Sequence, residues 1–291
     1  MGTTQFRLIV VALLSVTAMS LVPVLIKFTS ANIETIGSAR LGISLLALTP
    51  LMFFMRAFRQ LNRSDWSWLL LAGLCFGLHW WTYFYAIKAA GAAAGAIAMS
   101  TFGIHLLLLN WIIHRHRVSL FECLLIGVCI FGCYLVVQSP AIDRAATVGF
   151  LVGVFSAFLY GAMPLIHRRI IHLPTTTRTW GQFAFAGAFF LALWPQTDWQ
   201  LAPSDWWALL VLGTLCTLFA HALWVKASSE LPGVITSSIH YLYPPMTVVQ
   251  SYFFLGETIT AATVTGTALI IGANLILLVS PWIRLRRRQQ L

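Results

Sequence analysis

The sequence predicts an all-α integral membrane protein of ten transmembrane helices, arranged as two inverted five-helix repeats. Three observations predict this fold class: an apolar composition, ten apolar segments in succession, and matching residues in the two halves. Of the 291 residues, 59% are hydrophobic and 9% are charged, whereas soluble domains are about 45–50% apolar and about 25% charged. A lipid bilayer can accommodate apolar surface that a soluble chain of this length could not bury.

Ten apolar segments follow one another with short polar breaks, and each is long enough to cross about 30 Å of hydrocarbon as a helix. Because the breaks are short, we expect no extramembrane domain of any size. An even number of spans places both termini on the same side of the membrane. The predicted spans are residues 8–28, 33–55, 66–88, 92–113, 119–138, 148–167, 177–196, 205–227, 233–254 and 261–282.

The positive charges indicate which side holds the termini. Fourteen of the 18 Lys and Arg residues lie in segments on the N-terminal side, three lie on the opposite side, and Arg40 lies within the second span. Cytoplasmic segments carry an excess of Lys and Arg, so we expect both termini in the cytoplasm and the chain in the cytoplasmic (inner) membrane. The net charge of +10 forms no stripe on a soluble face, and we therefore expect no nucleic-acid partner.

The two halves, residues 1–140 and 141–291, contain similar residues in the same order. Pro23 in the first span matches Pro164 in the sixth, and a shift of 138 residues places Lys88 on another lysine. Because each half has five spans, an odd number, the second half is inverted relative to the first. Such repeats are typical of secondary transporters, with the substrate site near the midplane between them. The two prolines are candidate hinges, with a passive kink as the alternative.

Polar and aromatic residues share one face in the third and eighth spans. His79 and Tyr83 are four residues apart, and the 138-residue shift places them on Thr217 and His221. A polar face is costly in lipid, so we expect it to line a cavity for amphipathic organic molecules. The alternative role is hydrogen bonding between helices. With weaker patterns in other spans, the candidate substrate-binding residues are His79, Tyr83, Ser100, Thr217, His221, Trp224, Ser238, His240, Tyr241, Tyr243, Met19, Tyr160, Met163 and Trp180.

The positions of the acidic residues bear on ion coupling. All eight map to loops or predicted helix ends, whereas ion relays through membranes commonly use a carboxylate near the midplane. We therefore expect uncoupled transport, and the alternative is that His79, His221 or His240 carries a proton. The sequence contains no zinc-protease, Walker or nucleophile-elbow motif, so we expect no enzyme activity, no cofactor and no metal.

The end of the second half resembles a known family. Arg40 also resembles an arginine in the second helix of that family. The first half departs from the pattern, because it has no glutamate that matches Glu257. We therefore expect Glu257 to have a structural role at a helix start. The residues that resemble the closing signature of EamA-type repeats, in the drug/metabolite transporter superfamily, are Pro244-Pro245, Leu255-Gly256-Glu257-Thr258-Ile259, Gly266 and Leu269-Ile270-Ile271-Gly272.

The resemblance implies two EamA units and an exporter of amino acids or other small metabolites. Within the superfamily the chain is most similar to aromatic amino acid exporters of the YddG type. We expect a monomer that exports aromatic or large neutral amino acids by alternating access through a central cavity. The alternatives are a carrier for cationic drugs, nucleosides or sugar derivatives, and a membrane scaffold or pore.

Overall fold

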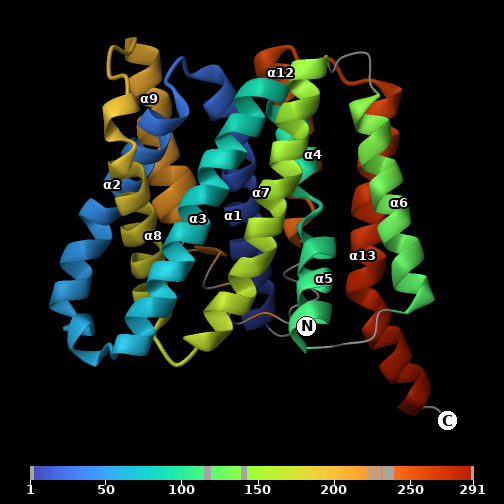
Figure 1. Ribbon diagram of the computed structural model, residues 1–291, viewed down its shortest axis with the longest axis horizontal. Coiled ribbons are helices and arrows are strands. Elements are labelled where there is room, and N and C mark those ends of the chain that lie inside the picture. Colours follow the sequence, from blue (N-terminus) through green and yellow to red (C-terminus); the bar gives the residue numbers. More distant parts are fainter. Residues whose placement is uncertain are drawn as a thin grey trace.

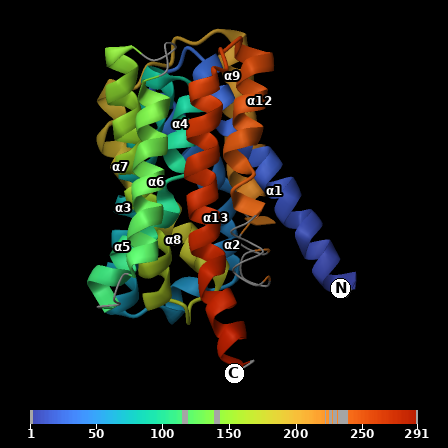
Figure 2. The ribbon, with the colours of Figure 1, turned by 90° about the vertical axis from the view of Figure 1, so that its right-hand side faces the viewer.

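A computed structural model describes residues 3–114, 119–138, 143–221, 223–224, 227, 231 and 239–289. Every regular element in these ranges is helical, and the helices run side by side along one axis (Figure 1). The start of α1 and the end of α13 lie toward the same end of the bundle (Figures 1 and 2). The helices of the first half are α1 (Thr3–Phe28), α2 (Ile33–Phe54), α3 (Arg63–Ala90), α4 (Ala92–Met99), α5 (Phe102–His114) and α6 (Leu120–Val137).

The second half begins with long helices and continues with shorter ones. Its elements are α7 (Arg144–Arg169), α8 (Thr175–Ala192), α9 (Pro203–Val211), the π-helical segment η3 (Leu212–Phe219), α12 (Tyr243–Leu255) and α13 (Ala261–Gln289). Two short 3-10 helices, η1 (Ala57–Gln60) and η2 (Trp194–Gln196), lie in connections.

The helices correspond in order to the predicted spans. Six helical segments in the described ranges are long and apolar enough to cross a membrane, with α4 and α5 counted together as one. Two shorter apolar helices, Pro203–Phe219 and Ala261–Leu277, follow in the second half, which also contains α8 and α12. The predicted all-α, ten-span membrane fold is confirmed.

The fourth span differs from the prediction because it is two helices. The hydroxyl group of Ser100 donates to the Ile97 carbonyl oxygen at 2.6 Å, and that of Thr101 donates to the Ala98 carbonyl oxygen at 2.8 Å. These bonds supply partners to carbonyl groups at the end of α4, where the helical ladder stops. Hydropathy alone could not reveal this break because α4 and α5 are both strongly apolar.

The two candidate hinge prolines lie within continuous helices. Pro23 is inside α1 and Pro164 is inside α7, and neither helix is interrupted there. Irregular parts within the predicted spans include the Ser100–Thr101 break, the turn at Tyr241–Leu242 and the π-helical segment η3. A hinge role for Pro23 and Pro164 stays a prediction.

The helices of the two halves pack together in matching pairs. α3 packs on α7 and α8, whereas α1 packs on η3 and α2 packs on η3 and α8. α1 also contacts α12, and in the same way α7 contacts α4 and α5. The last pair is α6 with α13. Each helix has a counterpart at the same place in the order of the other half. When every helix in these pairs is replaced by its counterpart, the same pairs result. Two copies related by a pseudo-two-fold axis would pack in this way.

Small residues let α7 approach the first half closely. A methyl group placed on Gly153 would lie 2.8 Å from the Ala98 side chain and 3.1 Å from that of Ala86. One placed on Gly161 would lie 3.0 Å from the Phe102 carbonyl oxygen. These contacts leave no room for a side chain, so α3, α4 and α5 are held together along one face of α7.

The described acidic residues lie at helix ends and in connections. Asn62 and Asp65 form a capping box at the start of α3, and Ser119 and Glu122 form another at the start of α6. Asp143 caps α7. Such caps bond amide groups that have no partner within the helix. The other described acids, in a first helical turn or a connection, are Glu34, Asp198, Asp205 and Glu257.

Candidate functional site

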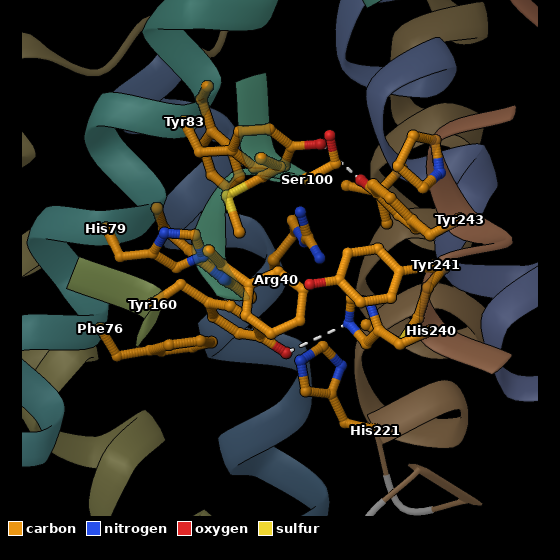
Figure 3. A pocket seen from close by; sticks show the side chains of 17 residues that line it. Arg40, Phe76, His79, Tyr83, Ser100, Tyr160, His221, His240, Tyr241 and Tyr243 are labelled. Carbon is orange, nitrogen blue, oxygen red and sulfur yellow. Dashed lines mark hydrogen bonds between the residues drawn. The ribbon is translucent and has the colours of Figure 1, made fainter. Parts of the chain in front are cut away.

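A pocket of about 600 Å³, including the space at its mouth, lies where the two halves meet (Figure 3). Both halves contribute aromatic and polar side chains to the wall. The lining residues are Met19, Val22, Arg40, Phe76, His79, Trp80, Tyr83, Phe84, Met99, Ser100, Phe102, Tyr160, His221, His240, Tyr241, Tyr243 and Pro244.

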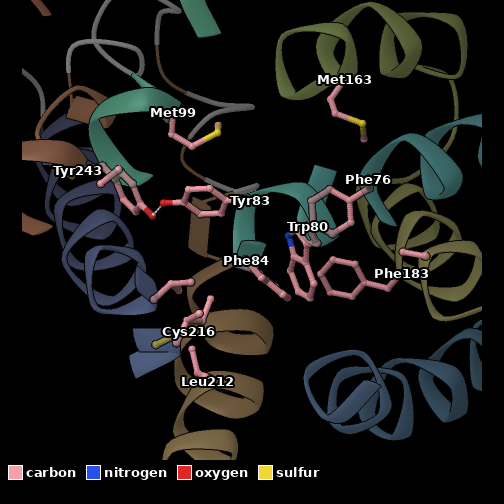
Figure 4. Close-up of a cluster of buried hydrophobic side chains, with 14 of the residues drawn as sticks. Phe76, Trp80, Tyr83, Phe84, Met99, Met163, Phe183, Leu212, Cys216 and Tyr243 are labelled. Atoms are coloured by element: carbon pink, nitrogen blue, oxygen red, sulfur yellow. Dashed lines mark hydrogen bonds between the residues drawn. The ribbon is translucent and has the colours of Figure 1, made fainter. Parts of the chain in front are cut away.

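Two tyrosines join the halves across the pocket. The hydroxyl oxygens of Tyr83, in α3, and Tyr243, in α12, lie 2.5 Å apart (Figures 3 and 4). Both side chains are buried. The pair therefore connects the first half to the second, and any widening of the pocket between α3 and α12 would break this hydrogen bond.

His79 lines the pocket and also joins α3 to α7. Its Nδ1 atom lies 3.1 Å from the Ser156 carbonyl oxygen and 2.8 Å from the Ser156 hydroxyl oxygen. The Ser156 hydroxyl group itself donates to the His79 carbonyl oxygen at 2.7 Å. We therefore assign the proton of the His79 ring to Nδ1, as the donor toward Ser156. This network fixes the ring, which stacks on Tyr83 with 5.8 Å between ring centroids.

His240 lies among rings from both halves. Its Nε2 atom is 3.4 Å from the Tyr160 hydroxyl oxygen. The Phe102 ring is tilted against it at 5.3 Å between centroids, and the Trp224 ring meets it edge-on at 5.0 Å. Trp224 therefore supports the pocket through His240 and is not itself part of the wall.

Arg40 is a lining residue that the candidate set did not include. Its Nε atom donates to the Thr217 hydroxyl oxygen at 2.9 Å, and its guanidinium carbon lies 4.0 Å from the centre of the Trp80 ring. Thr217, from the candidate set, therefore lies next to the pocket and holds Arg40. The sequence did contain a signal for Arg40, because it is a lone cation within an apolar span. Such residues usually face a cavity or a partner.

The aromatic wall of α3 was also missed. Phe76 and Trp80 line the pocket beside His79, and Phe84 continues the wall one turn beyond Trp80. The usable signal was helical phase, because Phe76 is three residues before His79 and so shares its face. Apolar rings alone gave no reason to prefer a cavity over lipid.

Nine of the candidate residues line the pocket, and four others lie elsewhere in the described chain. Met163 is buried in the apolar cluster next to the pocket (Figure 4). Trp180 lies outside the pocket: its indole nitrogen donates to the Thr49 hydroxyl oxygen at 3.1 Å, and its ring meets those of Phe58 and Trp66. Ser238 lies outside the described residues. The nine that line the pocket are Met19, His79, Tyr83, Ser100, Tyr160, His221, His240, Tyr241 and Tyr243.

A second cavity lies at the other end of the bundle from the start of α1. Its volume is about 1130 Å³, including the open space at its mouth, and its lining includes Lys27, Asp143 and Glu257. These residues are at the end of α1, the start of α7 and the connection after α12. The lining of this cavity therefore includes charged side chains.

Membrane-spanning helices in two similar halves, with a pocket between the halves, define a membrane protein of the transporter class. The EamA-like transporter family matches residues 6–138 and again residues 147–279, and the chain therefore belongs to this family of transporters.

One curated protein and one solved structure are also similar to the chain. The uncharacterized transporter YwfM of Bacillus subtilis (strain 168) is 23% identical over 229 residues, which are 77% of this chain and 77% of the relative. A crystal structure of another protein has a TM-score of 0.64 and covers 95% of this chain and 97% of its own. Its sequence identity is 14%, so this likeness concerns the fold alone.

Proposed function

We propose that the protein exports amino acids, with a preference for aromatic or large neutral side chains, by alternating access of the central pocket. The observation that carries this proposal is a pocket whose wall comes from both repeats. A carrier holds its substrate at this interface because movement of one repeat against the other can then expose the site to either side.

The composition of the wall supports the substrate class. Phe76, Trp80 and Phe102 offer flat apolar faces that suit an aromatic or large aliphatic side chain. Ser100 and Tyr243 have hydroxyl oxygens that can accept a hydrogen bond from a small polar head group while their bonds to Ile97 and Tyr83 are kept. An amino acid of this kind combines both parts in one molecule.

The proposed location is the inner membrane with both termini in the cytoplasm. The bias of 14 to three in positive charge supports this orientation, and so does the placement of the start of α1 and the end of α13 at one end (Figure 2). The second cavity would then lie on the outward side. A green fluorescent protein fused after Leu291 should fluoresce, and alkaline phosphatase fused there should be inactive. The opposite pattern would overturn the orientation.

The proposed transport is tested by counterflow in liposomes. Vesicles that hold the purified protein and unlabelled L-phenylalanine should accumulate external labelled L-phenylalanine, with saturable rates and competition by other large neutral amino acids. Protein-free vesicles are the control. Absence of saturable flux for every amino acid would overturn the proposal. The same assay with nucleosides, sugar derivatives and cationic dyes tests the other carriers, and flux that never saturates would indicate a pore.

A further inference from the structure

Arg40 places a positive charge inside the central pocket. The side chain comes from α2, and the residue is 2% exposed. Its guanidinium group lies in the middle of the ring of labelled pocket residues (Figure 3). An arginine within a membrane span is costly unless its charge and its N–H donors find partners.

One side of the guanidinium group is held in place by the protein. The Nε atom donates to the Thr217 hydroxyl oxygen at 2.9 Å, and Thr217 donates onward to the Leu212 carbonyl oxygen at 2.7 Å. Both Leu212 and Thr217 belong to the π-helical segment η3, and such segments are frequent at functional sites. Trp80 covers one face of the group at 4.0 Å. Arg40 is therefore oriented by contacts that do not neutralise it.

The other side of the group has no partner in the described part of the chain. The Nη1 atom is buried and without a hydrogen bond there, and none of the residues that line the pocket is acidic. The described acids lie at helix ends and in connections, and the eighth, Glu230, lies outside the described residues. A purely structural arginine would leave this donor unpaired at a considerable penalty.

We propose that Arg40 binds the carboxylate of the transported molecule, an inference that rests on the proposed function of the pocket as the transport site. A guanidinium group is planar, and its donors match the two oxygens of a carboxylate. The substrates are then aromatic or large neutral carboxylates, including zwitterionic amino acids. The ammonium group of an amino acid would lie against the surrounding rings, which attract cations. Cations that lack a carboxylate would meet an uncompensated positive charge.

The wild-type protein tests this with four related ligands. L-phenylalanine and 3-phenylpropionate keep the carboxylate, whereas L-phenylalaninamide and phenethylamine lack it. Binding to the purified full-length protein is measured by isothermal titration calorimetry. The two carboxylates should bind at least about 10-fold more tightly than the amide and the amine, since a charge-assisted hydrogen bond contributes about this much. Equal affinity for the acid and its amide, or no binding of either carboxylate, would overturn the proposal.

Variants of Arg40 give the second test. Arg40→Gln should weaken binding of 3-phenylpropionate about 10- to 100-fold, and Arg40→Lys should restore part of it because the charge remains while the planar fork is lost. Gly42→Ala is the matched control on α2, because a methyl group there would contact no atom within 4 Å. If Arg40→Gln fails to fold, the comparison of acid and amide in the wild-type protein decides.

The two proposals can fail separately. Binding of 3-phenylpropionate that depends on Arg40, without counterflow of any amino acid, would keep the carboxylate site and overturn amino acid transport. The opposite outcome is counterflow of L-phenylalanine that L-phenylalaninamide inhibits as strongly as a carboxylate ligand does and that is unchanged in Arg40→Gln. It would keep amino acid transport and overturn the carboxylate site.

Discussion

His79 and His221 line the same pocket but have different surroundings. His79 is bonded to Ser156 and so joins α3 to α7. His221 has a buried Nδ1 atom without a hydrogen-bond partner among the described residues. Its ring meets that of Phe183 with 5.8 Å between centroids. His79 therefore maintains the wall through a bond to another helix, whereas no comparable bond from His221 to another helix is present among the described residues.

This difference predicts different effects of one substitution at the two positions. His221→Phe keeps a flat ring and removes the polar atoms, so transport should fall about 10-fold, the value of one hydrogen bond to a charged group, with thermal stability unchanged. His79→Phe removes the bond to Ser156, so stability should also fall, by about 1 kcal/mol. Counterflow and thermal unfolding of the purified variants measure both effects. Wild-type transport by His221→Phe at equal expression would remove His221 from the site.

At the scale of helices, α6 and α13 depend on two glycines that face each other. A methyl group on Gly132 would lie 2.8 Å from the Gly266 carbonyl oxygen, and one on Gly266 would lie 2.6 Å from the Gly132 carbonyl oxygen. Gly127 and Gly272, on the same two helices, have no atom within 4 Å of such a group. The helices pair along their length (Figures 1 and 2), so close backbone approach at Gly132 and Gly266 sets their spacing.

Alanine substitutions should therefore divide these four glycines into two pairs. Gly132→Ala and Gly266→Ala force two backbones apart and should each lower stability by about 1–3 kcal/mol, as overpacking does. Gly127→Ala and Gly272→Ala are the matched controls and should leave stability unchanged or slightly raised, because alanine is the better helix former. Thermal unfolding in detergent measures the difference. A similar loss in all four variants would contradict the close approach.

Glu257 illustrates what a local pattern can and cannot predict about helices. The sequence predicted a structural role at a helix start. In the structure its carboxylate accepts the backbone N–H groups of Ala92 and Ala93, at 2.7 and 2.9 Å, at the start of α4. A negative charge is favourable there because the first amides lack partners and the helix dipole is positive. The capped helix lies more than 160 residues away in the chain, so only the tertiary fold could identify it.

At the scale of the whole molecule, the sequence predicted the fold better than the site. The spans follow from the length of the apolar segments, which the thickness of the bilayer imposes directly. The repeats follow from matched residues in the two halves. His79 and Tyr83 were found because polar atoms avoid lipid. Phe84 was missed because a phenyl ring is equally at home in lipid and in a pocket wall. The break at Ser100 was missed because it arises from hydroxyl groups that bond to nearby carbonyls.

The distribution of charge over the whole molecule also predicts how transport responds to a proton gradient. The pocket contains Arg40, whose charge is fixed, and no carboxylate from the described residues. A proton relay would therefore need His79, His221 or His240. We expect that counterflow of L-phenylalanine in liposomes proceeds at the same rate with and without an imposed pH difference. The control is a parallel sample in which an ionophore collapses the difference. Faster flux under the gradient would contradict uncoupled transport, and loss of that acceleration in His221→Phe or His240→Phe would identify the group that carries the proton.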